Sequence, residues 1–155
     1  IKWRRHRQDA PVFRDRLPDL SGALAEYSSN IESIIDLCEN NGVRLIFATQ
    51  PTIWRKDLPE DLLKLLWLGG TGNFQKETGK EYYAAGALAD AMRMYNEALL
   101  SICEKRHVEC VDLAALLPKD TSVFYDDCHF NETGSEKAAE IISQYMRRHR
   151  PFEKL

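Results

Sequence analysis

The chain has 155 residues, of which 44% are hydrophobic, and a formal net charge of −3, a size that suits one globular domain and is too short for two. This charge excludes the strongly basic balance expected of a chain that binds nucleic acid or acidic lipid over its whole surface. No apolar run approaches the ~20 residues of a transmembrane helix, and residues 1–20 contain no signal-peptide core, so the localisation stays open.

The first part of the chain differs from the rest in charge. Residues 1–16 contain only two acidic residues, Asp9 and Asp15, against six basic ones: Lys2, Arg4, Arg5, Arg7, Arg14 and Arg16. Such a segment is typical of a solvated lead-in, and an anion-binding arm is the alternative. We therefore expect residues 1–19 to be partly disordered and residues 20–155 to belong to one domain.

A helix followed by a buried strand is predicted at the start of this domain. Residues 20–41 place apolar side chains at intervals of three and four, which defines one face of a helix. Asp19 or Ser21 can cap its start, and Gly42 ends it. Residues 43–49 then form a nearly continuous apolar run, which favours a parallel strand buried on both faces.

Residues 52–80 are predicted to be irregular, apart from a short helix over 59–68. This segment lies beyond the carboxyl end of the first strand, where ligands bind in an open α/β sheet. Gln50, Trp54 and Trp67 are therefore candidate residues of a substrate pocket. The alternative is that the aromatic side chains only cover the edge of the core.

The second half of the chain repeats the alternation of helix and strand. Its pattern predicts a long helix over 81–107, a strand over 108–112, a short helix over 113–117 capped by Asp112, and a final helix over 132–149. No two-residue hairpin turn joins the predicted strands. We therefore expect them to be parallel neighbours between layers of helices, with their carboxyl ends at the same edge of the sheet.

A short turn ahead of the final helix contains the candidate catalytic residues. Asp126 and His129 are three residues apart, so the carboxylate can hold one ring nitrogen of the histidine and leave the other free to accept a proton. This is how a general base is built. In this interpretation Asp127 is expected to be a surface carboxylate. The alternative is a solvated acidic turn in which Asn131 only caps the helix.

This turn also carries a family resemblance. Asp-x-x-His at 126–129, Phe-Asn-x-x-Gly at 130–134 and the alanine-rich amphipathic helix that follows resemble the last conserved block of the SGNH (GDSL-like) hydrolases. Residues 45–51 are similar to the penultimate strand of that family and the loop after it. The resemblance runs from roughly residue 25 to the end. It implies a three-layer α/β/α flavodoxin-like fold, in which Asp126 and His129 complete a Ser-His-Asp triad for ester hydrolysis.

The resemblance also implies motifs that this sequence lacks. The Gly-Asp-Ser nucleophile block and the blocks that help form the oxyanion hole are not present. We therefore interpret the chain as the C-terminal part of such a domain, which needs its N-terminal half for activity on a small ester and is inactive alone. The 43–49 strand would then lack a neighbour, so the isolated chain is expected to self-associate. A non-catalytic ligand-binding or interaction module with the same fold is the alternative.

The thiol and the possible metal ligands of the turn do not predict a second kind of active site. Cys128 is disfavoured as a nucleophile, because adjacent residues in a turn usually point apart and no second base is evident. Asp126, Asp127, Cys128 and His129 mix hard and soft ligands without a recognised spacing, so neither a metal nor a cofactor is predicted. The chain has four cysteines: Cys38, Cys103, Cys110 and Cys128. Three of them are predicted to be core or near-core thiols, and the redox state of all four stays open.

Overall fold

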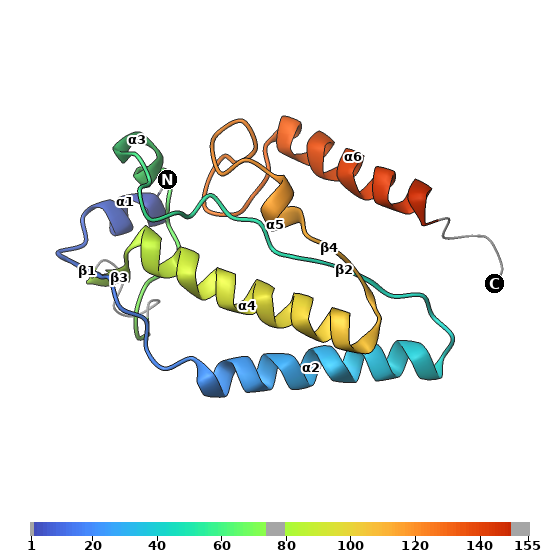
Figure 1. Cartoon of the computed structure of the whole chain (residues 1–155). Coiled ribbons are helices and arrows are strands. Elements are labelled where there is room, and N and C mark those ends of the chain that lie inside the picture. The colour runs from blue at the N-terminus through green and yellow to red at the C-terminus, as the bar shows by residue number, and fades with distance from the viewer. Residues whose placement is uncertain (1, 74–79, 150–155) are drawn as a thin grey trace.

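The structure is a computed structural model that describes residues 2–73 and 80–149 (Figure 1). Its elements in chain order are α1 (Lys2–Gln8), β1 (Val12–Arg14), α2 (Ser21–Asn40), β2 (Ile46–Ala48), α3 (Glu60–Leu63), β3 (Glu81–Tyr83), α4 (Ala85–Arg106), β4 (Glu109–Val111), α5 (Leu113–Leu116) and α6 (Glu132–Arg148). The chain is therefore a mixed α/β protein with small parallel sheets.

The strand pair β2 and β4 is parallel, as predicted, with Phe47 opposite Cys110. Figure 1 shows this pair between α6 and the two long helices α2 and α4. Alternate strand residues face the two sides. Ile46 and Val111 pack in the cluster that includes Ala138 of α6, whereas Phe47 and Cys110 pack against residues of α2 and α4. Helices therefore cover both faces of the pair.

The long helices α2 and α4 pack against each other through the apolar faces that their periodicity predicts. Their shared cluster contains Ile31, Ile35, Leu99, Ile102 and Cys103. Tyr27 and Tyr95 add an edge-to-face ring contact with centroids 5.0 Å apart. At the far end, Arg106 of α4 bonds three carboxylates of α2: Glu32, Asp36 and Glu39. Apolar contacts along the two helices and ion pairs at one end thus hold α2 and α4 together.

The prediction that residues 43–49 form a strand buried on both faces is wrong in part. Val43 is 56% exposed and Ala48 is also exposed. Within the described part of the chain, β2 has β4 as its one strand neighbour. Its other edge therefore stays open, and side chains near that edge keep contact with solvent.

A second parallel pair, β1 with β3, was not predicted. Val12 pairs with Glu81 and Arg14 pairs with Tyr83. The predicted helix over 81–107 therefore starts only at Ala85, because residues 81–83 are drawn into this pairing and two adjacent tyrosines favour extended backbone. The basic segment before residue 20 forms α1 and β1, which differs from the solvated lead-in expected from its composition.

The predicted helix over 59–68 shortens to α3. After Leu63 the chain tightens into a turn, with the Leu65 and Leu66 amides donating to carbonyl oxygens three residues back. The next two amides, of Trp67 and Leu68, donate instead to the carboxylate of Asp127. The helical hydrogen bonding does not continue past Leu66, because the amides of Trp67 and Leu68 have the Asp127 carboxylate as their acceptor. This ending brings residues 67–68 to the candidate site.

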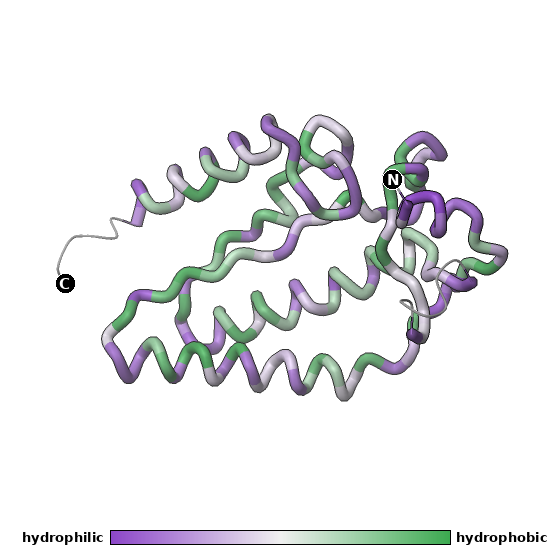
Figure 2. Tube along the Cα trace, turned by 180° about the vertical axis from the view of Figure 1, so that it is seen from behind, coloured by the Kyte–Doolittle hydropathy of each residue, from purple (hydrophilic) through white to green (hydrophobic). Residues whose placement is uncertain are grey.

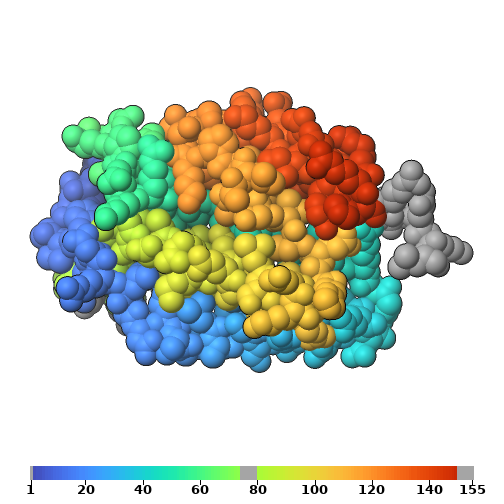
Figure 3. Space-filling view, in the orientation of Figure 1, coloured from blue at the N-terminus to red at the C-terminus, as the bar shows by residue number. Residues whose placement is uncertain are grey.

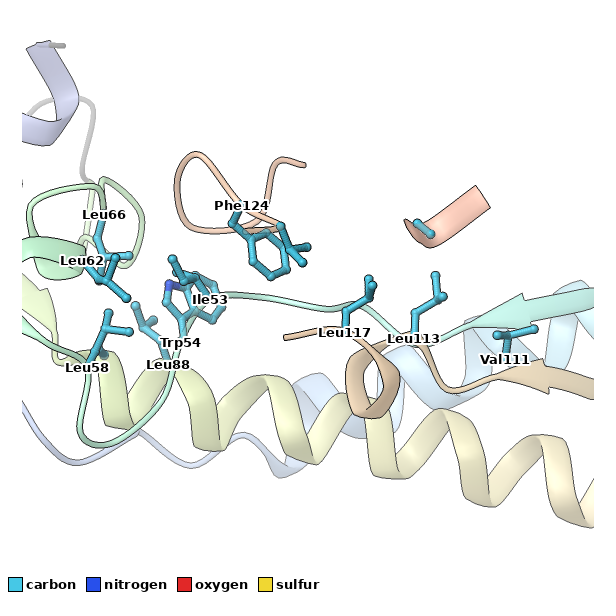
Figure 4. Close-up of a cluster of buried hydrophobic side chains, with 13 residues drawn as sticks. Ile53, Trp54, Leu58, Leu62, Leu66, Leu88, Val111, Leu113, Leu117 and Phe124 are labelled. Atoms are coloured by element: carbon cyan, nitrogen blue, oxygen red, sulfur yellow. The ribbon is translucent and has the colours of Figure 1, made fainter. Parts of the chain in front are cut away.

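The largest core cluster joins the segment after β2 to the segment before α6. Figure 4 shows Trp54 and Ile53 beside Leu62, Leu66 and Leu88, with Phe124 facing them from the turn. In Figure 2 the strand pair is mainly hydrophobic, while α2 and α6 alternate hydrophobic and hydrophilic residues along their length. No helix in residues 2–73 and 80–149 is both long and apolar enough to cross a membrane.

Candidate active site

The turn at residues 123–131 is a loop whose two ends are joined by backbone hydrogen bonds. Phe124 and Phe130 form an antiparallel bridge, the Tyr125 amide donates to the His129 carbonyl at 3.2 Å, and the Asn131 amide donates to the Val123 carbonyl at 2.9 Å. Asn131 then caps α6 by accepting from the Gly134 amide at 2.8 Å. The loop is therefore fixed directly to the start of a long helix.

Asp126 and His129 lie within hydrogen-bonding distance at this turn. Both carboxylate oxygens of Asp126 are 2.9 Å from Nδ1 of His129. An ionised carboxylate only accepts hydrogen bonds, so this contact places the ring proton on Nδ1 and leaves Nε2 as the acceptor nitrogen. Among residues 2–73 and 80–149, Nε2 has no hydrogen-bond partner, and the His129 side chain is 52% exposed.

Asp126 itself is held from several sides, although it is only 4% exposed. Its Oδ1 accepts from the backbone amides of Cys128 and His129 at 3.1 and 3.0 Å, and its Oδ2 accepts from the Trp67 indole N–H at 3.1 Å. Burial raises the pKa of Asp126, but these hydrogen bonds and that from His129 outweigh burial and keep its pKa below the ordinary value. The carboxylate therefore stays ionised at neutral pH.

Two aromatic rings lie parallel to the imidazole. The Trp67 ring is 6.3 Å from the His129 ring with an interplanar angle of 5°, and the Tyr125 ring is 5.7 Å away at 20°. Together with the Asp126 contact at Nδ1, these rings restrict how the imidazole can rotate. Trp67 therefore touches both members of the pair: it donates to the carboxylate and stacks on the ring.

The prediction that Asp127 is a surface carboxylate is wrong, because this side chain is 0% exposed. It accepts from the Trp54 indole at 2.9 Å and from the amides of Trp67 and Leu68 at 2.7 and 3.4 Å. Burial raises the pKa of Asp127 above its ordinary value, although these donors and the charge of Arg7 act in the opposite direction. The buried indole N–H of Trp54, which needs an acceptor, was a signal for this role.

The three pocket candidates lie in different places. Trp67 is beside His129, as described, whereas Trp54 is buried in the large core cluster with its indole N–H bonded to Asp127. Gln50 is exposed and lines a cavity of about 350 Å³ together with Asn96, which its backbone contacts. None of the residues that line this cavity belongs to the 123–131 turn. The structure thus brings Trp67 to the pair and leaves Gln50 apart from it.

The thiol of Cys128 is close to the wrong nitrogen for activation by His129. Its Sγ is 4.0 Å from Nδ1, which Asp126 already holds. Burial raises the pKa of Cys128, and the charges of Asp126 and Asp127 raise it further, so the thiol stays protonated. All four cysteines are free.

Asp126, Cys128 and His129 also form a possible group of metal ligands. Donor atoms of Asp126, Cys128 and His129 lie within 4.8 Å of one another, and they are the group of described residues that has the right spacing to hold an ion. In the structure, Oδ1 of Asp126 already accepts from two backbone amides, and Nδ1 of His129 uses its proton to contact the carboxylate. Chemically, this arrangement can serve as a base whose ring is held by a carboxylate.

Comparisons with known proteins do not place this chain in a family. No family model, no curated protein and no solved structure matches it.

Proposed function

We propose that this chain supplies the general base, His129, and its orienting carboxylate, Asp126, to a serine ester hydrolase of the SGNH class. The observation that carries the proposal is the contact of both Asp126 oxygens with Nδ1 at 2.9 Å, combined with an exposed ring whose Nε2 is free among the described residues. A histidine held in this tautomer can take a proton from a nucleophile and return it to a leaving group.

The reaction that fits this geometry is acyl transfer in two steps. His129 takes the proton of a serine hydroxyl through Nε2 while the serine oxygen attacks the ester carbonyl, and the ionised Asp126 stabilises the resulting imidazolium. The imidazolium then gives its proton to the departing alcohol. Water repeats the sequence on the acyl-serine and releases the acid. The substrate class is therefore a small-molecule ester.

The serine and the oxyanion donors are proposed to come from another segment of the same gene product. The sequence contains no Gly-Asp-Ser block, and the described strand pair supports this because the outer edge of β2 has no strand neighbour among the described residues. A parallel pair with helices on both faces fits the C-terminal portion of a three-layer flavodoxin-like sheet.

A second candidate function is ligand binding without catalysis. A cavity of about 390 Å³ is lined by four apolar residues, which include Phe13 and Leu63, and by four charged or polar ones, Arg7, Gln8, Glu60 and Lys64. No residue of the 123–131 turn lines it. Phe13 and Leu63 are both exposed, and exposed apolar side chains around a hollow suit an apolar ligand. Absence of esterase activity in the full-length gene product would favour this function.

Exchanging His129 in the full-length gene product tests the proposal. With a short-chain aryl ester as substrate, His129→Ala should lower turnover by about 10⁴-fold, because the serine then has no base. The matched control is His149→Ala, since His149 is exposed, stacks on Tyr145 and lies at the opposite end of α6 from the turn. Equal turnover of both variants and the unmodified protein would overturn the proposal.

A further inference from the structure

Arg7 is a buried cation at the edge of the candidate site. Its residue is 3% exposed, although it lies on the short and otherwise charged helix α1. Nη1 donates to the Leu68 carbonyl and Nη2 to the Tyr83 carbonyl, both at 2.7 Å. The guanidinium also lies 5.3 and 5.2 Å from the ring centroids of Phe13 and Tyr82. All of these contacts are made by one side chain that is far from the turn in sequence.

The Leu68 peptide joins Arg7 to Asp127. Its carbonyl oxygen accepts from Arg7, and its amide donates to Oδ2 of Asp127 at 3.4 Å, beside the Trp67 amide at 2.7 Å. Burial lowers the pKa of Arg7 and raises that of Asp127, and each charge partly offsets the burial of the other. Removing the cation would leave a buried carboxylate without its compensating charge.

Trp67 joins Asp127 to the base. Its backbone amide is fixed by Asp127, its indole N–H donates to Asp126 and its ring stacks on His129. A displacement of the 67–68 peptide would therefore move the ring that limits the rotation of the imidazole. A continuous chain of contacts thus leads from Arg7 through Leu68 and Asp127 to Trp67, and from there to the pair.

The helix α1 contacts the site region at two further points. Arg4 donates to the Tyr125 carbonyl at 2.8 Å, and Gln8 donates to the Lys64 carbonyl at 2.8 Å. Figure 3 shows the N-terminal residues in blue at the same end of the molecule as the green segment that contains α3. The basic N-terminal segment is therefore attached to both parts of the chain that meet at His129.

We infer that Arg7 is a positioning residue for the Asp126–His129 pair, acting through the Leu68 peptide, Asp127 and Trp67. The inference rests on the proposed function for its effect on turnover, but its effect on the imidazole position does not depend on any activity. This role gives a functional reason for burying an arginine that contacts neither Asp126 nor His129 directly.

The test compares Arg7→Met, Arg7→Lys and Arg14→Met. Methionine is long and apolar but has neither the charge nor the two donors; lysine keeps the charge but cannot bridge both carbonyls. Arg14 is the matched control, since it belongs to the same N-terminal segment, is exposed and pairs with Glu81. The readout in the 155-residue chain is the NMR shift of the His129 ring protons, which depends on the Trp67 ring. Trp67→Leu gives the reference for a lost stack.

Arg7→Met should move the His129 resonances toward those of Trp67→Leu, Arg7→Lys should move them less, and Arg14→Met should leave them unchanged. In the full-length gene product, Arg7→Met should lower kcat by about tenfold to a hundredfold with little change in KM, and Arg7→Lys should restore part of the loss. If Arg7→Met does not fold, a shift in Arg7→Lys supports the inference.

His129 resonances that stay unchanged in every folded Arg7 variant would overturn it. Shifted resonances in a full-length protein that has no esterase activity would instead overturn the proposed function and leave the positioning role in place.

Discussion

The Asp126→Asn variant of the full-length gene product should keep its fold and lose about four orders of magnitude of turnover. Asparagine keeps an oxygen for the two backbone amides that Oδ1 accepts, so the turn stays closed. Its NH2 group would then take the place of Oδ2, which contacts both Nδ1 of His129 and the Trp67 indole N–H. Facing Nδ1, it favours the tautomer with the proton on Nε2, which cannot take a proton from serine.

The measurement is kcat on an aryl ester, with circular dichroism to check the fold. Loss of the Trp67 hydrogen bond should lower the free energy of unfolding by only about 1 kcal/mol. Asp57→Asn is the control, because Asp57 is exposed and lies outside the turn. A loss of turnover below tenfold in Asp126→Asn would mean that Asp126 does not orient the base.

The Gly134→Ala variant should be strongly destabilised, by about 3 kcal/mol. A Cβ on Gly134 would clash with the Val123 carbonyl oxygen, which is backbone and also accepts from the Asn131 amide. The helix start and the turn would therefore have to separate. The missing side chain at residue 134 is what lets α6 approach the base of the turn.

Urea unfolding of the chain measures this effect. Gly22→Ala is the matched control, since Gly22 also lies in the first turn of a helix but a Cβ there would meet nothing within 4 Å. That exchange should stabilise the chain by about 0.5–1 kcal/mol through the better helix propensity of alanine. Similar free energies of unfolding for the two variants would show that the helix can shift without cost.

The parts of the fold that were predictable depend on short-range patterns. Helices α2 and α6 follow from apolar residues spaced by three and four, and the Asn131 cap follows from its place before α6. The Asp126–His129 contact was also predictable, because three residues separate the two side chains in a turn. Parallel pairing of β2 with β4 followed from the helix between them.

The parts that were missed depend on contacts between distant residues. Asp126 and Asp127 are adjacent and both buried, and the burial of Asp127 depends on N–H donors from Trp54 and Trp67, which lie some 60 to 73 residues earlier. The β1–β3 pairing and the burial of Arg7 likewise join segments more than 60 residues apart. Local composition described the N-terminal segment as solvated because it contains no information on these partners.

The most direct test of the central claim is labelling of the full-length gene product with a fluorophosphonate, which reacts with serine hydroxyls activated by a neighbouring base. Peptide mapping identifies the labelled serine. We expect one labelled serine outside residues 1–155, with labelling lost in His129→Ala and kept in His149→Ala. Absence of labelling, or labelling that does not depend on His129, would contradict the assignment of this residue as the base.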